Sequence, residues 1–150
     1  MLALEIRSKG LGFAIFYGPE TLLNWGMCEA VPDKGDLLSQ TIASLIDEAS
    51  PSVIVIGTSG RPAGLATVRI ISSAVRKQGL AIDHVSRQQV SAVFTGHNQN
   101  KHEIGLAISE RFPELAAYIP PKRKPWNSED YRTRVFDAVA SGLTHFHLNA

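Results

Sequence analysis

The chain has 150 residues, a mass of 16.3 kDa and a formal net charge of +1, from 15 Lys and Arg against 14 Asp and Glu. This length suits one domain with a single core, predicted over 1–150, and the near-neutral charge excludes a polybasic protein. The single cysteine, Cys28, excludes an internal disulfide and is expected to be a packed thiol.

The N-terminal part of the chain has the pattern of three strands. Over 2–7, apolar side chains alternate with smaller or charged ones at period two. After turn signals, further strands are predicted at 11–17, with Gly12 and Ala14 on one thin face, and at 21–30. Such tight connections predict an antiparallel meander.

The period then changes to that of helices alternating with strands. Apolar residues follow one helical face over 37–46, and 52–56 is a β-branched run typical of a strand buried on both faces. A second helix is predicted over 65–75 and a short strand over 80–85. We therefore predict an α/β fold with a mixed five-stranded sheet, three antiparallel strands followed by parallel strands, flanked by helices.

The last third of the chain is expected to be helical, with polar connections. The segment 90–100 is polar, 101–112 is predicted as a helix that Pro113 stops, and 119–125 is a proline-containing loop. Asn127 or Ser128 is predicted to cap a final helix that runs to about residue 145.

Two carboxylates are candidates for chemistry. Glu5 sits mid-strand among apolar neighbours, where it must face solvent at an edge, pair with a cation such as Arg7 on its own face, or bind metal. Asp137 lies on the flank of the apolar stripe of the last helix, from which it can point toward the sheet. Arg134 is expected to pair with Asp137, Asp130 or both. A structural and a functional role are compatible with each carboxylate.

The densest basic patch of the chain precedes and opens this last helix. It consists of Lys122, Arg123, Lys124, Trp126, Arg132 and Arg134. Its cations would favour phosphates, and Trp126 could stack on a base, so the patch is a candidate nucleic-acid surface. A solvated loop is the alternative.

No segment has the length or apolarity of a membrane span or a signal peptide. The longest purely aliphatic run is 53–56, and Glu5 and Arg7 interrupt the first apolar residues. We therefore expect a cytoplasmic protein with no membrane partner.

The order of these elements, together with four segments, resembles the RuvC family of Holliday-junction resolvases, in the ribonuclease H-like superfamily. The segments are LALEIRSKGLGFAI, PSVIVIG, VSRQQVSAVFTGHNQNK and FDAVASGLTHF. The resemblance covers most of the chain and implies a divergent member with a ribonuclease H-like fold. It also implies branched DNA as a partner, in recombination or repair, and a homodimer.

In that family, four carboxylates hold two Mg²⁺ ions that activate water against a phosphodiester. The resemblance places Glu5 at the first-strand acid, Asp137 at the last acid and Lys101 at the lysine near the scissile phosphate. Of the remaining two acid positions, one falls on or next to Gly57 and the other falls on Arg134. These charges cannot balance two divalent ions, so the set is interpreted as vestigial. One Mg²⁺ or Mn²⁺ on Glu5 and Asp137 stays open as an alternative.

Three hypotheses follow. The leading one is a RuvC-like protein that binds branched or structured DNA through the basic patch and Lys101. In this hypothesis the nuclease site is degraded or altered, and Glu5, Arg134 and Asp137 form a vestigial network. The second is an active metal-dependent Holliday-junction endonuclease that recruits a further acid from 129–130 or a histidine. The third is a non-catalytic structural or protein-interaction module.

Overall fold

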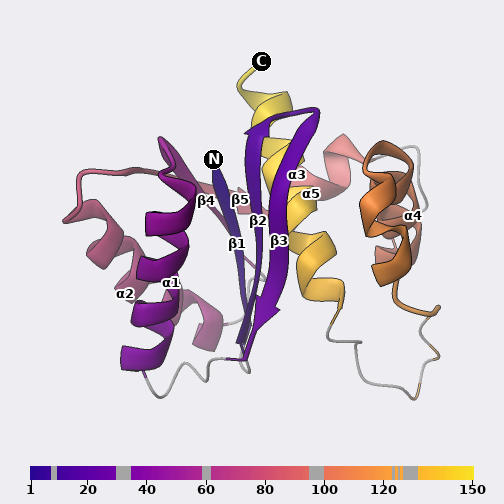
Figure 1. Ribbon diagram of the computed structural model, residues 1–150. Coiled ribbons are helices and arrows are strands. Elements are labelled where there is room, and N and C mark those ends of the chain that lie inside the picture. Colours follow the sequence, from indigo (N-terminus) through magenta and orange to yellow (C-terminus); the bar gives the residue numbers. More distant parts are fainter. Residues whose placement is uncertain are drawn as a thin grey trace.

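The fold is built on a five-stranded sheet, seen nearly edge-on in Figure 1. The computed structural model describes residues 1–7, 10–29, 35–58, 62–94, 100–122, 124, 126 and 132–150. The strands are β1 (Leu2–Arg7), β2 (Gly10–Gly18), β3 (Thr21–Cys28), β4 (Val53–Thr58) and β5 (Ala81–Ser86). Their spatial order is β3-β2-β1-β4-β5. Strands β1, β2 and β3 pair antiparallel, whereas β4 pairs parallel with β1 and β5, which confirms the predicted mixed sheet.

Strand β1 lies at the centre of this sheet and is covered on both faces. Its even-numbered residues, such as Leu4, belong to one hydrophobic cluster, and Ala3 belongs to the other. Glu5 shares the face of Ala3 because successive side chains of a strand alternate. The prediction of period two is confirmed, but Glu5 lies on the central strand and not at an edge of the sheet.

The helices form one layer on each face of the sheet (Figure 1). Helices α1 (Gly35–Ala49) and α2 (Pro62–Arg76) cover one face. Helix α5 (Thr133–Leu148) covers the other, and α3 (Arg87–Val93) and α4 (Lys101–Arg111) pack against it. A short 3₁₀ helix, η1 (Pro113–Tyr118), follows α4.

Helix α5 lies close to the sheet because the strands beneath it carry small residues. A Cβ built on Gly12 would lie 2.2 Å from the carbonyl oxygen of Arg134, so only glycine fits this approach. Ala14, on the same face of β2, is fully buried. The predicted thin face of the second strand is confirmed, and it determines how closely α5 approaches the carboxylate of β1.

The C-terminal part differs from prediction at α3, at the 3₁₀ helix η1 and at both ends of the last helix. Helix α3 was not predicted, although Ser86 and Gln89 form a capping box that marks its start. The last helix begins at Thr133 and ends at Leu148, whereas we expected it to begin near 127 and end near 145. The predicted caps Asn127 and Ser128 lie outside the described residues.

The remaining elements of the second half follow the predicted order. Helix α4 ends at Arg111, before Pro113, as its sequence indicated. In the part of the chain that the structure describes, no helix has the length and apolarity needed to cross a bilayer.

Candidate functional site

The candidate site lies at the carboxyl ends of the parallel strands β1 and β4, beneath helix α5. Glu5 of β1 stands in register with Gly57 of β4 on one side and with Gly12 of β2 on the other. Only 4% of Glu5 is exposed. Because an isolated buried carboxylate is costly, this position requires a partner for the charge.

That partner is Arg7, two residues further along the same strand and on the same face. Its Nη2 lies 3.2 Å from Oε1 of Glu5 and donates a hydrogen bond to Oδ2 of Asp137 at 2.5 Å. The Arg7 side chain is about one-fifth exposed. One guanidinium therefore bridges the carboxylate of the central strand and the carboxylate of α5, with the charge-assisted geometry that strengthens such bonds.

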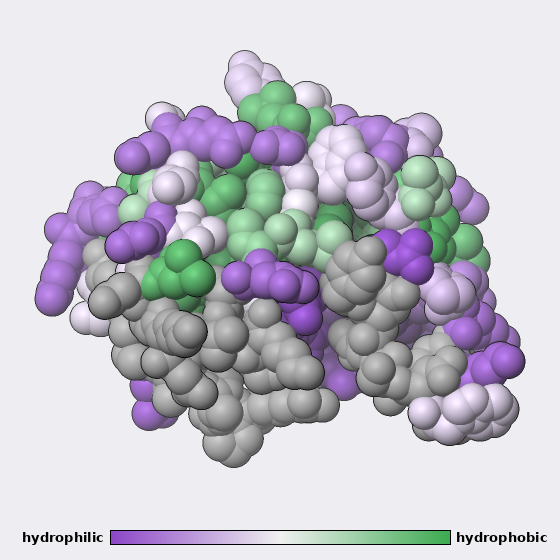
Figure 2. All heavy atoms as spheres, turned by 60° about the horizontal axis from the view of Figure 1, so that its bottom comes forward, coloured by the Kyte–Doolittle hydropathy of each residue, from purple (hydrophilic) through white to green (hydrophobic). Residues whose placement is uncertain are grey.

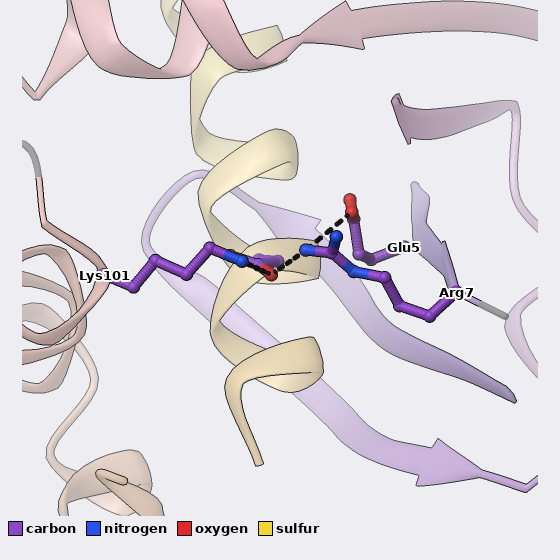
Figure 3. Close-up of polar contacts among 4 residues, drawn as sticks. Glu5, Arg7 and Lys101 are labelled. Carbon is purple, nitrogen blue, oxygen red and sulfur yellow. Dashed lines mark hydrogen bonds and ion pairs between the residues drawn. The ribbon is translucent and has the colours of Figure 1, made fainter. Parts of the chain in front are cut away.

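Lys101 approaches the same carboxylate from the opposite side, as Figure 3 shows. Its Nζ lies 3.0 Å from Oδ2 of Asp137. The lysine is the first residue of α4, and its position is fixed by the cap residue Asn100, whose side chain accepts a hydrogen bond from the backbone N–H of Glu103 at 2.8 Å. Arg7 thus contacts both carboxylates, and Lys101 adds a second cation at Asp137.

Gly57 has no room for an acidic side chain in this arrangement. A Cβ built on Gly57 would lie 2.1 Å from Oε2 of Glu5 and 2.6 Å from Oγ of Ser141. The resemblance placed a missing central-strand acid at or next to this glycine. The carboxylate of Glu5 occupies the space next to Gly57 instead. Ser141 of α5, which the sequence analysis did not single out, borders the same space.

The structure corrects the predicted role of Arg134. Its backbone packs on Gly12, and its Nη1 lies 3.1 Å from where a Cβ on Gly10 would be. Among the described residues, Arg134 forms no ion pair with Asp137. Helix α5 turns Asp137 toward the end of β1 and places Arg134 over β2, so the bridging cation is Arg7 and not Arg134. Asp130 and Glu129 lie outside the described residues.

The charges at the site bear on the Mg²⁺ or Mn²⁺ that the resemblance implies. Within the described residues, no group of three or more His, Cys, Asp or Glu is placed to hold a metal ion. Glu5 and Asp137 already face cations, and a divalent ion between them would have to displace Arg7. This donor set does not fit a pair of divalent ions.

The described part of the basic patch lies on the surface. Lys122 and Lys124 are exposed, and Nζ of Lys124 lies 5.6 Å from the ring centroid of Trp126, a cation–π contact. The indole is 78% exposed. Arg132 is half-buried just before α5, and Arg123 lies outside the described residues. A lysine and an exposed indole thus stand together, as stacking on a base next to a phosphate requires.

Hydrophilic side chains are prominent at the end of the molecule where β1 ends. Figure 2 turns this end forward and shows them gathered in patches around a paler, more apolar strip.

Comparison with known proteins identifies the fold. No protein-family model and no curated protein matches the chain. The structure of Thermus thermophilus RuvC is similar at a TM-score of 0.67 and 16% identity, covering 99% of this chain and 96% of that one. T. thermophilus RuvC in complex with a Holliday junction substrate gives 0.69 at 15% identity, covering 99% and 95%. Fowlpox virus resolvase, in complex with Holliday junction DNA, gives 0.56 at 12% identity, covering 96% and 98%. The chain therefore has the ribonuclease H-like fold of the RuvC-type resolvases.

Proposed function

We propose that this chain binds branched DNA through a resolvase-type fold and that its own cations neutralise the carboxylate site, so that it holds the DNA without cutting it. The observation that carries the proposal is the guanidinium of Arg7 between Glu5 and Asp137. Two of the structurally similar proteins were solved with Holliday junction DNA, which supports this class of ligand.

The charge balance supports binding without cleavage. Two-metal hydrolysis needs carboxylates that are free to coordinate ions about 4 Å apart. Here Arg7 and Lys101 both form ion pairs with Asp137, and Arg7 also forms one with Glu5. A cation covalently fixed in the site competes with any divalent ion for the same oxygens, and it can also face the phosphate that the fold would bring there.

The proposed DNA contacts come from both sides of the site. Lys122, Lys124 and Trp126 would hold the backbone and stack on an unpaired base, and Arg123 and Arg132 would extend this surface. Lys101 would lie nearest the phosphate over the site. A homodimer would present two such surfaces to the two-fold symmetry of a four-way junction, and it forms part of the proposal.

Binding and cleavage are tested in one experiment. A labelled four-way junction and a duplex of the same length are titrated with the protein over a salt series, in EDTA and in millimolar Mn²⁺, and the DNA is then run on a denaturing gel. We expect tighter binding of the junction, affinity that falls steeply with salt, and intact strands. Lys122→Gln should reduce the salt slope by about one.

Two results would contradict the proposal in different ways. Strand cleavage in Mn²⁺ that is lost in Asp137→Asn would identify an active endonuclease. Absent or salt-insensitive DNA binding would identify a structural or protein-interaction module.

The role of Arg7 has a sharper test with a matched control. Arg7→Gln removes the guanidinium that contacts both Glu5 and Asp137, while Lys101 stays beside Asp137, and we expect Mn²⁺ binding, measured by electron paramagnetic resonance, to increase. Arg134→Gln removes the same charge three residues from Asp137 but outside the network, and should leave Mn²⁺ binding at the wild-type level. Equal Mn²⁺ binding by all three proteins would show that Arg7 does not keep divalent ions away from Glu5 and Asp137.

A further inference from the structure

A second polar site lies on the opposite face of the sheet. A cavity of about 520 Å³ opens between α2 and β5. Helix α2 lies on the face of the sheet opposite to α5 (Figure 1). The polar residues that line it are Arg69, Ser72, Ser73, Arg76, Lys77 and His84. The sequence analysis did not single out any of them.

The helix geometry explains why these side chains converge. Positions 69, 72, 73 and 76 are spaced at i, i+3, i+4 and i+7, which places them on one stripe of α2. His84 belongs to β5 and stands in register with Ile56, whose side chain lies in the core on the α2 side. One stripe of the helix and one face of the strand therefore supply the walls of the same cavity.

The charges in this cavity have one sign. Arg69, Arg76 and Lys77 are cationic, His84 has a ring N–H to donate, and no carboxylate is among the described residues that line the cavity. Compensation of the helix dipole accounts for Arg76 and Lys77, because α2 ends at Arg76. It does not account for Arg69, which lies two turns earlier. Cations gathered without carboxylates favour an anionic ligand.

Ser72 adds an independent observation. The residue is only 5% exposed, and its hydroxyl is buried without a hydrogen-bond partner in the described structure. Buried hydroxyl groups nearly always have partners, since an unsatisfied one costs free energy. Because Ser72 lines the cavity, rotation about its Cα–Cβ bond would let the hydroxyl donate to a ligand oxygen there.

We propose that this cavity is a phosphate-binding site. A phosphate group offers several acceptor oxygens and a negative charge, which match guanidinium forks and a hydroxyl donor. The phosphate could belong to a nucleic-acid backbone or to a small molecule, and both present the same oxygens. The site does not depend on DNA binding at the opposite face, so the two proposals can fail separately.

The test titrates the full chain with inorganic phosphate at constant ionic strength, with chloride as the reference anion, and follows backbone amides by NMR. We expect saturable shifts confined to the ends of α2 and β5. Arg76→Gln should weaken phosphate binding about tenfold, as loss of a charge-assisted hydrogen bond does. The control Arg87→Gln removes an exposed arginine at the start of α3 and should leave the affinity unchanged.

Ser72→Ala makes the test independent of charge. It removes the hydroxyl without changing the net charge, and we expect weaker phosphate binding with no loss of thermal stability. The proposal is overturned if phosphate gives no saturable shifts, if Arg87→Gln weakens binding as much as Arg76→Gln, or if Ser72→Ala binds phosphate as wild type does.

A second arm identifies the source of the phosphate. If DNA affinity falls in Arg76→Gln and not in Arg87→Gln, the site takes a backbone phosphate. If DNA affinity is the same in both while inorganic phosphate still binds, the site takes a small phosphorylated molecule.

Discussion

The two faces of the sheet arrange their charges in opposite ways. On the α5 face, Arg7 contacts both Glu5 and Asp137, and Lys101 contacts Asp137. On the α2 face, Arg69 and Arg76 line a cavity in which the described lining residues include no carboxylate. A cation that contacts a carboxylate has its partner, whereas a cation at an open cavity still attracts an anion. On the first face, cations of the chain itself contact the carboxylates. On the second, the cations line a cavity, and we propose that a ligand binds there.

The largest expected effect tests how much the ion pairs of Arg7 on the α5 face stabilise the fold. Arg7→Ala leaves Glu5 buried without the guanidinium beside it, and should lower the free energy of unfolding by about 4 kcal/mol, as the loss of one partner of a buried pair does. Denaturant unfolding measures this. The exposed Arg87→Ala should cost less than about 0.5 kcal/mol. Similar losses in both variants would show that the network contributes little to stability.

The next effect tests how closely α5 lies on the strands. At Gly12, a Cβ would meet the backbone of Arg134, which cannot move without the helix. At Gly57, it would meet the ends of the Glu5 and Ser141 side chains, which can turn away. We expect Gly12→Ala to cost about 3 kcal/mol and Gly57→Ala about 1 kcal/mol in denaturant unfolding. The reverse order would mean that the carboxylate, and not the helix, is the rigid part of this face.

Two buried hydroxyl groups sharpen the comparison between the faces. Thr144 of α5 donates to the carbonyl oxygen of Ala140 at 2.8 Å, whereas the hydroxyl of Ser72 in α2 has no partner in the described structure. Thr144→Val should therefore destabilise by about 1 kcal/mol, and Ser72→Ala should be neutral or stabilising by up to about 1 kcal/mol. Calorimetry in phosphate-free buffer measures both. A loss of stability in Ser72→Ala would indicate a partner for this hydroxyl.

The smallest effect concerns Cys28, which lies outside both charged regions and provides a reference. Burial raises the pKa of its thiol above the usual value of 9.0. The thiol form is thus favoured in the folded state, so this contribution to stability is complete below pH 9 and is lost as the pH rises through the higher pKa of the folded protein. We expect the stability of wild type to fall slightly more than that of Cys28→Ala above pH 9. Identical pH profiles would show that the thiol is solvated.

The sequence predicted the sheet better than the site. Alternation over 2–7 and the β-branched run before Gly57 each determine a strand, because burial on one or both faces imposes the pattern directly. The sequence analysis did not predict helix α3, because the helix is seven residues long and none of its residues is buried, so no buried apolar face marks it. Its capping box, Ser86 and Gln89, was the available signal.

The spacing of residues along the sequence could not show which cation bridges Glu5 and Asp137. Arg134 is three residues from Asp137 on one helix, and that proximity favours a pair. Which of them faces the sheet depends on how α5 settles over Gly12, a tertiary contact that no local pattern contains. Arg7 was visible only as a neighbour of Glu5 on the same strand face, and its contact with Asp137 joins residues 130 positions apart.

Because Arg7 and Glu5 belong to one strand, the positive charge in the carboxylate site is tethered and cannot dissociate. A coordinated ion leaves when a chelator lowers its activity, and returns only as fast as the solution supplies it. A side chain two residues away is present at a high and constant effective concentration. The geometry at this end of β1 should therefore be the same in EDTA as in metal-rich buffer, and indifferent to the divalent-ion content of its surroundings.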